Sequence, residues 1–298
     1  MINFLDQLEL CFRNMNSHLE NCVPYWENHR EHLWKMINRI SDISDSSGNS
    51  LIIGAGNCYD LPLDLICKNY MENHLLDLDE QSLIHTMEAC TFRSKINLIK
   101  KDLTGIDETE ANELLRCLTY KEYNKAESIL IAWIHGTICP LSLLGSKKYS
   151  LVISSTVSTQ LLLPLIQTIE QSGNNRLIAL AKQLGDILAE KHFFQFRNLL
   201  NDKNGVGIIT SEQYAWGRLM DGRNLPLSNF IDKPELMLSH DTQRLIEKQG
   251  GPFTINGRIN FDKLINYLPE LQILSQDQWI WRFSENIYYL VKGWIIKK

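Results

Sequence analysis

One short segment constrains the fold of this chain more than any other: the apolar run Leu51–Ile53, which leads directly into Gly54-Ala55-Gly56-Asn57. A fully apolar run of this length that ends at a glycine is typical of a strand buried on both faces. Glycine lacks a β-carbon, so two glycines allow a sharp turn and let a ligand lie against the backbone. The segment therefore predicts an α/β sheet with a nucleoside-binding turn after its first strand.

Helix and strand patterns alternate after this turn. We expect a helix over 61–73, a strand over 74–78, a helix over 81–92 and a strand over 96–100. Alternation at this spacing indicates βαβ units and a parallel sheet. Later segments with the same patterns are expected to form helices over 108–118, 122–136, 161–172 and 176–200 and strands over 149–154 and 205–210.

The two ends of the chain depart from this alternation. Residues 1–44 carry apolar positions at helical spacing, and they predict a helical addition or lid before a main domain over 50–298. At the other end, two β-rich runs over 278–283 and 287–296 are joined by three polar residues. These runs predict a C-terminal hairpin.

Two parts of the main domain are less regular. Residues from about 105 to 148 predict a helical insert between two strands. Residues from about 211 to 275 show no sustained periodicity, and they are expected to be irregular. Within them, Asn256-Gly257 stands between short apolar runs and is typical of a tight turn.

Acidic residues follow the second and third predicted strands. Asp77 ends the second strand about 20 residues after the glycine turn, a spacing at which a carboxylate accepts hydrogen bonds from ribose hydroxyls. Its alternative role is to cap the next helix, for which Asp79 is better placed. Asp102 follows the third strand and either accepts a hydrogen bond from an adenine amino group or forms a turn. These groups meet at the carboxyl edge of the sheet, where open α/β sheets bind ligands.

Two classes of nucleoside cofactor use a glycine turn with an acid after the second strand. The dinucleotide motif needs a third glycine for close packing of helix on strand, and this chain has Tyr59 there. A dinucleotide-binding sheet ends in a parallel strand, whereas a methyltransferase sheet inserts its last strand antiparallel. The residues therefore favour S-adenosylmethionine, and a nicotinamide-dependent oxidoreductase is the weaker alternative.

The order of these motifs resembles that of class I S-adenosylmethionine-dependent methyltransferases. The segments that carry the resemblance are Leu51–Leu63, Leu76–Asp79, Lys101–Leu103, Tyr149–Ser155 and the closing hairpin from Trp279 to Val291. They cover about 50–172, 205–213 and 277–296, and they identify the superfamily without a subfamily. The resemblance implies a Rossmann-like seven-stranded sheet with an antiparallel C-terminal hairpin, an N-terminal helical addition, and S-adenosylmethionine as cofactor.

The resemblance also implies which residues bind this cofactor. The chain at Gly54, Ala55 and Gly56 would pass under the methionine part, and Asn57 and Asp60 belong to the same loop. Many members carry a third glycine where this chain has Cys58, so the loop departs from the family pattern there. The remaining positions are Asp77 on the ribose, Leu78 beside the adenine, Asp102 and Leu103 at the adenine amino group, and Ser154 and Ser155 beside the transferring methyl.

Composition restricts the partners of the chain. The net charge is -5 and the basic residues are scattered, whereas a duplex nucleic acid partner requires a basic surface. Seven cysteines occur without any C-x-x-C pair, so neither a zinc site nor a disulfide framework is predicted, and no metal is expected. No apolar run reaches membrane-spanning length and no signal peptide is evident, so we expect a cytoplasmic protein without a membrane partner.

The expected chemistry is methyl transfer to a small-molecule or peptide acceptor. Methyl transfer needs alignment of the acceptor and exclusion of water more than a strong base, so no catalytic residue is assigned. The segment after the fourth strand reads Ile-Ser-Ser-Thr-Val-Ser, without the Asn-Pro-Pro-Tyr motif of enzymes that methylate base amines or glutamine amides. A non-catalytic binding or scaffold module with the same fold is the second hypothesis.

Aromatic and histidine residues provide further candidates. Tyr25 and Trp26 lie in the expected lid and would cage a cationic group, although a core position is favoured for Trp26. In the hairpin, Trp279 and Trp281 share one face, which either borders a substrate pocket or packs on a helix. His29 lies one helical turn from His32, and a solvated helix face is favoured over a metal cluster there.

Overall fold

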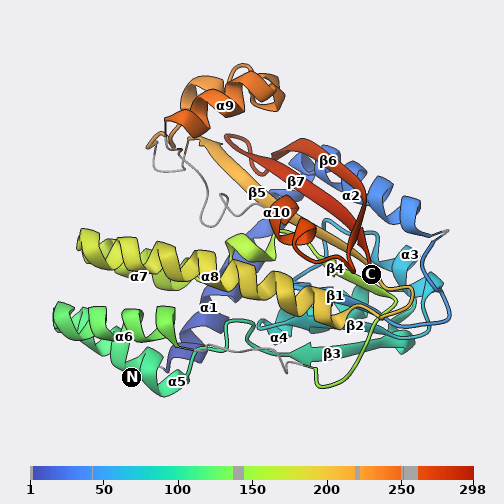
Figure 1. Cartoon of the computed structure of the whole chain (residues 1–298), viewed down its shortest axis with the longest axis horizontal. Coiled ribbons are helices and arrows are strands. Elements are labelled where there is room, and N and C mark those ends of the chain that lie inside the picture. The colour runs from blue at the N-terminus through green and yellow to red at the C-terminus, as the bar shows by residue number, and fades with distance from the viewer. Residues whose placement is uncertain (1–2, 42, 137–143, 219–221, 250, 252–260) are drawn as a thin grey trace.

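A seven-stranded sheet forms the centre of the molecule (Figure 1). The computed structural model describes residues 3–41, 43–136, 144–218, 222–249, 251 and 261–298. The strand order is β3-β2-β1-β4-β5-β7-β6, and all neighbours are parallel except β7, which is antiparallel to both β5 and β6. This confirms the predicted Rossmann-like sheet with an antiparallel C-terminal hairpin. The strands are β1 (Ser50–Ile53), β2 (Asn73–Asp77), β3 (Ile96–Lys100), β4 (Leu151–Ser154), β5 (Val206–Gly217), β6 (Gln272–Arg282) and β7 (Ile287–Lys297).

The place of β1 at the centre of the sheet explains why three of its four residues, Leu51–Ile53, are apolar. It pairs with β2 on one side and β4 on the other, and every residue in it is buried. Leu51 and Ile53 belong to the core on one face of the sheet, whereas Ile52 belongs to the core on the opposite face. A parallel strand with helices on both faces has no solvent side, so apolar residues predominate in it. Its one polar residue, Ser50, donates its hydroxyl to Oδ1 of Asn73 on β2 at 2.7 Å.

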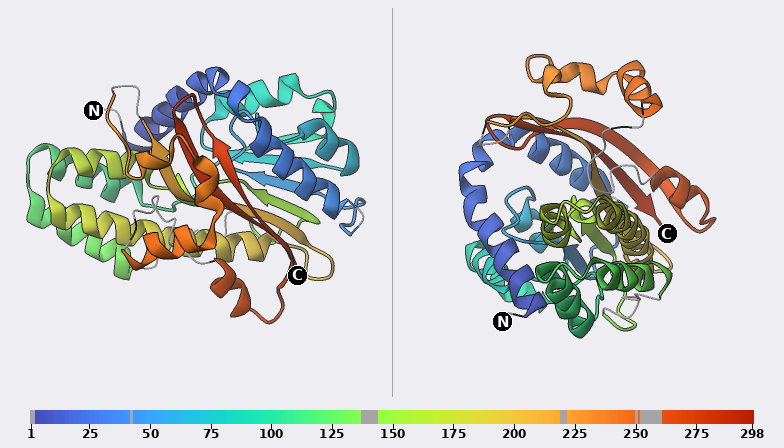
Figure 2. Two further views of the ribbon diagram at one scale, coloured as in Figure 1. Left: turned by 90° about the horizontal axis from the view of Figure 1, so that it is seen from above. Right: turned by 90° about the vertical axis from the view of Figure 1, so that its left-hand side faces the viewer.

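Helices cover both faces of this sheet (Figure 2). One expected helix, over 61–73, is shorter in the structure, because Pro62 precedes its first residue and Tyr70 is already extended. None of the helices in the described ranges combines the length and apolarity needed to cross a membrane. The helices are α1 (Phe4–His18), α2 (Glu27–Ile40), α3 (Leu63–Asn69), α4 (Glu80–Ala89), α5 (Glu108–Thr119), α6 (Tyr123–His135), α7 (Leu163–Gln171), α8 (Asn175–Leu199), α9 (His240–Lys248) and α10 (Phe261–Asn266).

A helical layer extends from one edge of the sheet and contains α5, α6, α7 and the first half of α8 (Figure 1). Its apolar core also includes Val157 and Leu161, which follow β4, and Leu78 and Leu103, which follow β2 and β3. The layer therefore packs against the carboxyl edge of the parallel strands. The second half of α8 leaves this layer and packs on the sheet through residues such as Phe196.

The two N-terminal helices lie against different parts of the molecule. α1 begins at the N-cap Asn3 and buries Phe4 and Leu8 in the core of the helical layer. α2 packs across the hairpin, where Met36 lies close to Gly293 of β7 and to Trp279 of β6. The chain between them crosses the carboxyl edge of the sheet.

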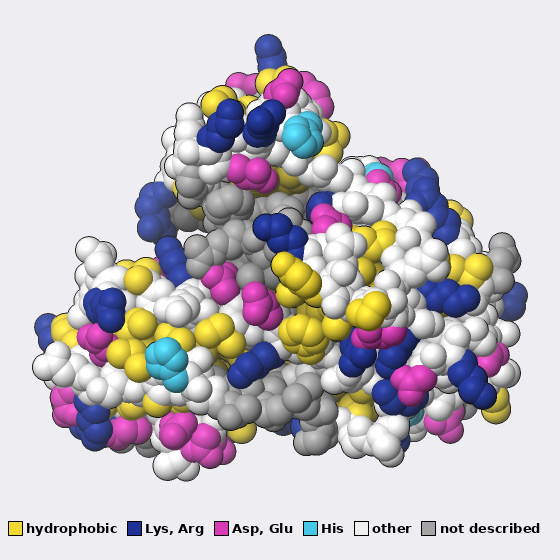
Figure 3. Space-filling view, viewed as in Figure 1, with side chains coloured by type: hydrophobic (Ala, Val, Ile, Leu, Met, Phe, Trp, Pro, Cys, Tyr) yellow, Lys and Arg dark blue, Asp and Glu magenta, His cyan; other side chains and the backbone are white. Residues whose placement is uncertain are grey.

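The expectation of an irregular region over 211–275 is wrong at both ends. β5 continues to Gly217 and β6 begins at Gln272, six residues before the predicted hairpin strand. Between them, the described part contains α9, α10 and short 3₁₀ turns, and α9 projects above the body of the molecule (Figure 3). The turn predicted at Asn256-Gly257 lies outside the described residues.

Candidate active site

Two adjoining cavities lie at the carboxyl edge of the parallel strands. The larger has a volume of about 800 Å³ and the smaller about 100 Å³. They share the glycine turn, the start of the loop after β4 and one side of α1, so they form one continuous trough. The residues that line both cavities are Phe12, Asn16, Gly54, Gly56, Ser155 and Gln160.

The glycine turn has the backbone conformation that its sequence predicts. Gly54 and Gly56 have φ values of 66° and 47°, in the left-handed region. A β-carbon at Gly54 would lie 2.4 Å from a methyl carbon of Val157, so a side chain is excluded there by packing as well. Cys58 also adopts a positive φ of 48°, although residues with a β-carbon disfavour this region. Cys58 therefore adopts a conformation that is common for glycine.

Asp77 joins the glycine turn to the end of β2. Its Oδ2 accepts a hydrogen bond from the Gly56 N–H at 2.8 Å, and its Oδ1 accepts one from the Asp79 N–H at 2.9 Å. Burial raises the pKa of this carboxyl, and the two backbone donors act in the opposite direction. Asp79 caps α4 by accepting a hydrogen bond from the Ser82 N–H, which confirms the capping role predicted for it. Asp77 is left at the wall of the smaller cavity.

The smaller cavity also collects the predicted residues that follow β2 and β3. Leu78, Asp102 and Leu103 line it together with Asp77. Asp102 accepts hydrogen bonds from the Thr104 N–H at 3.1 Å and the Thr104 hydroxyl at 2.7 Å. Asp102 is therefore a turn residue, as one interpretation of the sequence predicted, and it also borders the cavity.

Ser154, the last residue of β4, and Ser155, which follows it, point in different directions. Ser154 is buried and its hydroxyl lies 2.7 Å from Nε2 of His192 in α8, so it lines neither cavity. Ser155 lines both cavities, and its hydroxyl donates to Oδ2 of Asp60 at 2.9 Å. Asp60, Ala55 and Asn57 line the larger cavity.

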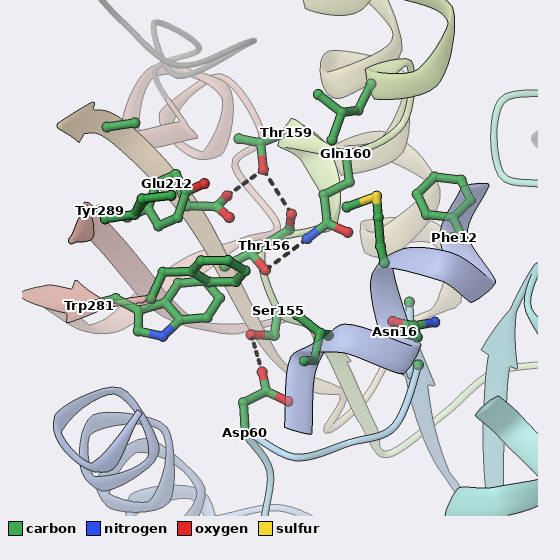
Figure 4. Close-up of a pocket in the computed structure, with 18 of the residues that line it drawn as sticks. Phe12, Asn16, Asp60, Ser155, Thr156, Thr159, Gln160, Glu212, Trp281 and Tyr289 are labelled. Carbon is green, nitrogen blue, oxygen red and sulfur yellow. Dashed lines mark hydrogen bonds between the residues drawn. The ribbon is translucent and has the colours of Figure 1, made fainter. Parts of the chain in front are cut away.

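α1 lies over the glycine turn and partly covers the trough. The Asn57 side chain donates to the backbone carbonyl of Asn16 at 3.1 Å, and the Asn16 side chain donates to Oδ2 of Asp79 at 2.8 Å. Figure 4 shows Phe12 and Asn16 on this helix at one side of the larger cavity. The N-terminal segment therefore contacts the loop that the sequence marks for cofactor binding.

The opposite wall of the larger cavity is aromatic. Trp281 and Phe283 come from the hairpin, Tyr289 from β7, and Trp26 from the segment before α2. The ring centroids of Trp281 and Tyr289 are 5.6 Å apart, and those of Trp26 and Trp281 are 5.2 Å apart. Trp26 is also a core residue whose indole N–H donates to the Phe283 carbonyl, as favoured from the sequence. Tyr25 lines neither cavity. The Cζ atom of the Arg282 guanidinium lies 4.7 Å from the centroid of its ring.

A fully buried histidine supports this wall from behind. The expectation of a solvated face is wrong for His29, because its ring stacks on Trp281 at 4.1 Å and accepts the Trp279 indole N–H at Nδ1. Because an indole N–H can only donate, Nδ1 carries no proton, and the neutral ring keeps its proton on Nε2, 3.7 Å from Oδ2 of Asp60. Burial lowers the pKa of His29 in the same sense. Both sequence alternatives for the hairpin tryptophans apply, since Trp281 borders the cavity and Trp279 packs on α2. Within the described ranges, no cluster of three or more metal-ligating side chains occurs.

Glu212 is the main residue of the cavity that sequence reasoning missed. It lies on β5 and is 5% exposed, and its carboxylate is hydrogen bonded to the Thr159 hydroxyl (Figure 4). Burial raises the pKa of this carboxyl to about 7. Continuing the strand alternation beyond Thr210 would have placed Glu212 on β5, but three consecutive polar residues are normally read as the end of a buried strand.

The sheet order, the glycine turn and the acid that ends β2 together define the fold of class I S-adenosylmethionine-dependent methyltransferases. No family model matches the chain, and no curated protein matches it. Among solved structures, the chain is similar to an S-adenosylmethionine-dependent methyltransferase from Anabaena variabilis, with 13% identity, coverage of 100% of this chain and 96% of that chain, and a TM-score of 0.46.

Two further solved structures show a similar degree of likeness. One is the N-methyltransferase NodS from Bradyrhizobium japonicum in complex with S-adenosyl-L-homocysteine, with 11% identity, 95% of this chain and 97% of that chain covered, and a TM-score of 0.42. The other is an S-adenosylmethionine-dependent methyltransferase from Clostridium acetobutylicum, with 12% identity, coverage of 90% of this chain and 91% of that chain, and a TM-score of 0.40. The fold of this chain is defined by its own strand order, independently of these superpositions.

Proposed function

We propose that this protein transfers a methyl group from S-adenosylmethionine to a small-molecule or peptide acceptor. The observation that carries the proposal is the continuous trough at the carboxyl edge of the sheet. Its smaller part has the features of a nucleoside site, and its larger part is an aromatic chamber with room for an acceptor. The glycine turn lies where the two parts meet, which is where a methyl donor would need to lie.

The residues at the trough fit the proposed cofactor. Asp77 offers a carboxylate to ribose hydroxyls, and Leu78 and Leu103 offer apolar surface to adenine. Gly54 and Gly56 leave backbone exposed for the methionine part. When bound, S-adenosylmethionine would supply an electrophilic methyl group. The protein would hold the acceptor and exclude water from it with the aromatic wall and α1.

The charge of the larger cavity supports a small acceptor over a nucleic acid. Four carboxylates line it among the described residues, against one lysine, Lys182. Phosphate groups require basic partners, so a nucleic acid backbone would be repelled from this lining. We therefore propose that the acceptor carries no cluster of negative charges.

Calorimetric titration with S-adenosylmethionine tests the proposed cofactor, with an Asp77→Asn variant as the probe of the site. We expect saturable binding by the unmodified protein and a roughly 10- to 100-fold loss in the variant, because charge-assisted hydrogen bonds to ribose are lost. Asp241→Asn, on the exposed surface of α9, is the matched control and should bind normally. Absence of binding by the unmodified protein would refute the proposal.

Transfer of radiolabelled methyl groups into components of a cell extract tests catalysis separately. A labelled product supports methyl transfer. Cofactor binding without any labelled product would instead support the non-catalytic binding module. Saturable fluorescence binding of a reduced nicotinamide cofactor would favour the oxidoreductase alternative.

A further inference from the structure

We propose that Asp60 binds the acceptor: its carboxylate accepts a hydrogen bond from the nitrogen or oxygen atom that is to be methylated. The acceptor is therefore a molecule whose attacking atom carries a hydrogen. This inference rests on the proposed function, because it concerns the same trough. It is carried by the place of Asp60, between the glycine turn and the aromatic wall.

Asp60 lies just beyond the point where the two cavities meet. The residues that line both cavities mark this point, and Ser155 is one of them. The Ser155 hydroxyl donates to Oδ2 of Asp60, whereas Asp60 itself lines only the larger cavity. Figure 4 shows the Asp60 side chain rising from its loop toward Ser155. Asp60 is therefore on the acceptor side of the junction, within one hydrogen bond of it.

The aromatic wall begins on the other side of Asp60. The ring of His29 stacks on Trp281, and its Nε2 atom lies 3.7 Å from the same Oδ2 atom of Asp60. His29 is fully buried, whereas Trp281 lines the larger cavity. The carboxylate therefore stands between the junction and the ring against which an acceptor would pack.

The contacts of Asp60 fix the carboxylate without closing it off. Ser155 and His29 both approach Oδ2, and the Asp60 side chain is 19% exposed at the cavity. The buried Nε2–H of His29 has no hydrogen-bond acceptor within the described ranges, and a buried donor favours any movement that satisfies it. His29 thus acts as a positioning residue that draws Oδ2 toward the wall, and a bound molecule can still reach the carboxylate.

A carboxylate selects among nucleophiles because it can only accept hydrogen bonds. An amine or a hydroxyl can donate an N–H or O–H group to Asp60, and this charge-assisted bond would hold the attacking atom at the junction. Such alignment is the main requirement of methyl transfer. A thioether or a tertiary amine has no hydrogen to donate, so it would lack this anchor.

Calorimetry on the full chain with two analogues of the cofactor tests the inference. S-adenosylhomocysteine has no methyl group on its sulfur, whereas sinefungin carries an amino group at the position of that methyl. The amino group of sinefungin therefore imitates the N–H of an acceptor. We expect sinefungin to bind about tenfold more tightly than S-adenosylhomocysteine, because it gains a charge-assisted hydrogen bond to Asp60. Equal affinities for the two analogues would overturn the inference.

The variant Asp60→Asn shows whether Asp60 causes this preference, because it keeps the size of the side chain and removes its charge. We expect the preference for sinefungin to fall about fivefold, while the affinity for S-adenosylhomocysteine stays within about twofold of that of the unmodified protein. Asp241→Asn, exposed on α9 and outside both cavities, is the matched control and should keep the full preference.

Two results with folded Asp60→Asn would overturn the inference. An unchanged preference would mean that another group binds the amino group of sinefungin. An equal loss of affinity for both analogues would mean that Asp60 holds the amino-acid part that they share. If Asp60→Asn does not fold, Ser155→Ala decides, because it removes the hydroxyl that holds Oδ2. The preference should then fall at least twofold, and an unchanged preference would contradict the role of Asp60.

The two proposals fail separately. Absence of S-adenosylmethionine and S-adenosylhomocysteine binding by the unmodified protein refutes the proposed function itself. Normal cofactor binding without a preference for sinefungin that depends on Asp60 refutes the role of Asp60 alone.

Discussion

Glu212 and Asp77 show how a single residue couples stability to function. Both are carboxyls whose pKa is raised by burial, but Asp77 accepts two backbone N–H groups that partly offset it. Glu212 accepts hydrogen bonds from the Thr159 hydroxyl and from its own backbone N–H, which also partly offset the effect of burial. Because the folded pKa of Glu212, about 7, lies above the value in an unfolded chain, the folded state binds more protons in between. Its contribution to stability is therefore lost as pH rises through this window.

Replacing Glu212 by glutamine should stabilise the free protein at alkaline pH. At pH 8 we expect the unfolding free energy of Glu212→Gln to exceed that of the unmodified protein by on the order of 2 kcal/mol, because no buried charge is formed. Near pH 5 the difference should be small, since Glu212 is then protonated in the folded state. Urea denaturation at both pH values measures this. A variant that is less stable than the unmodified protein at pH 8 would contradict the prediction.

At the level of elements, α8 connects the helical layer to the sheet, and a glycine permits the contact. Phe196 of α8 is fully buried against β5, where Gly207 presents no side chain. A β-carbon at Gly207 would lie 2.3 Å from the Cζ atom of the Phe196 ring. The ring is enclosed by other core residues, so it has no free space into which it could move.

The variant Gly207→Ala should therefore destabilise the protein by about 1–3 kcal/mol through overpacking. Chemical denaturation of Gly207→Ala, Phe196→Leu and the double variant forms a mutant cycle that isolates this contact. We expect the double variant to be more stable than the sum of the two single effects predicts, because the smaller leucine leaves room for the methyl group. If the effects of the two single variants simply add in the double variant, contact with Phe196 is not the cause of the lower stability of Gly207→Ala.

Across the whole molecule, three buried histidines make stability depend on pH. Burial lowers the pKa of His29 behind the aromatic wall, of His74 on β2, and of His192 on α8, the last to about 4. In an unfolded chain these side chains titrate near pH 6.5, so between the two values the unfolded state binds more protons. Stability should therefore fall as the pH is lowered below about 6.5.

The variant His192→Gln tests the contribution of the buried histidine on α8. Between pH 8 and pH 5, His192 should lower the unfolding free energy of the unmodified protein by about 2 kcal/mol. The glutamine variant should not show this part of the decrease. Denaturation curves at pH 8, 6.5 and 5 measure how steeply the unfolding free energy changes with pH. His85→Gln, an exposed histidine of α4, is the control and should leave the slope unchanged. An equal slope in His192→Gln would contradict the prediction.

The parallel half of the fold could be predicted from the sequence because its central strands have no solvent side. β1 and β4 consist mainly of apolar residues, and β2 and β3 each contain two or three. Glycines and acids stand at the carboxyl ends of β1, β2 and β3, where a ligand-binding edge requires them. β5 could be recognised only in part. Its second half buries Thr210, Ser211 and Glu212, and polar residues of this kind are ordinarily exposed.

The sequence by itself determined the α/β class, the position of the glycine turn, and the acids that lie beside it. These follow from local rules: buried strands are apolar, sharp turns need glycine, and carboxyl ends of parallel strands share one edge. The tertiary structure decided which side chains face the trough. It placed Ser155 at the trough and Ser154 against His192, and it buried His29 and Glu212. Local patterns do not encode these outcomes, because each depends on which distant element covers the residue.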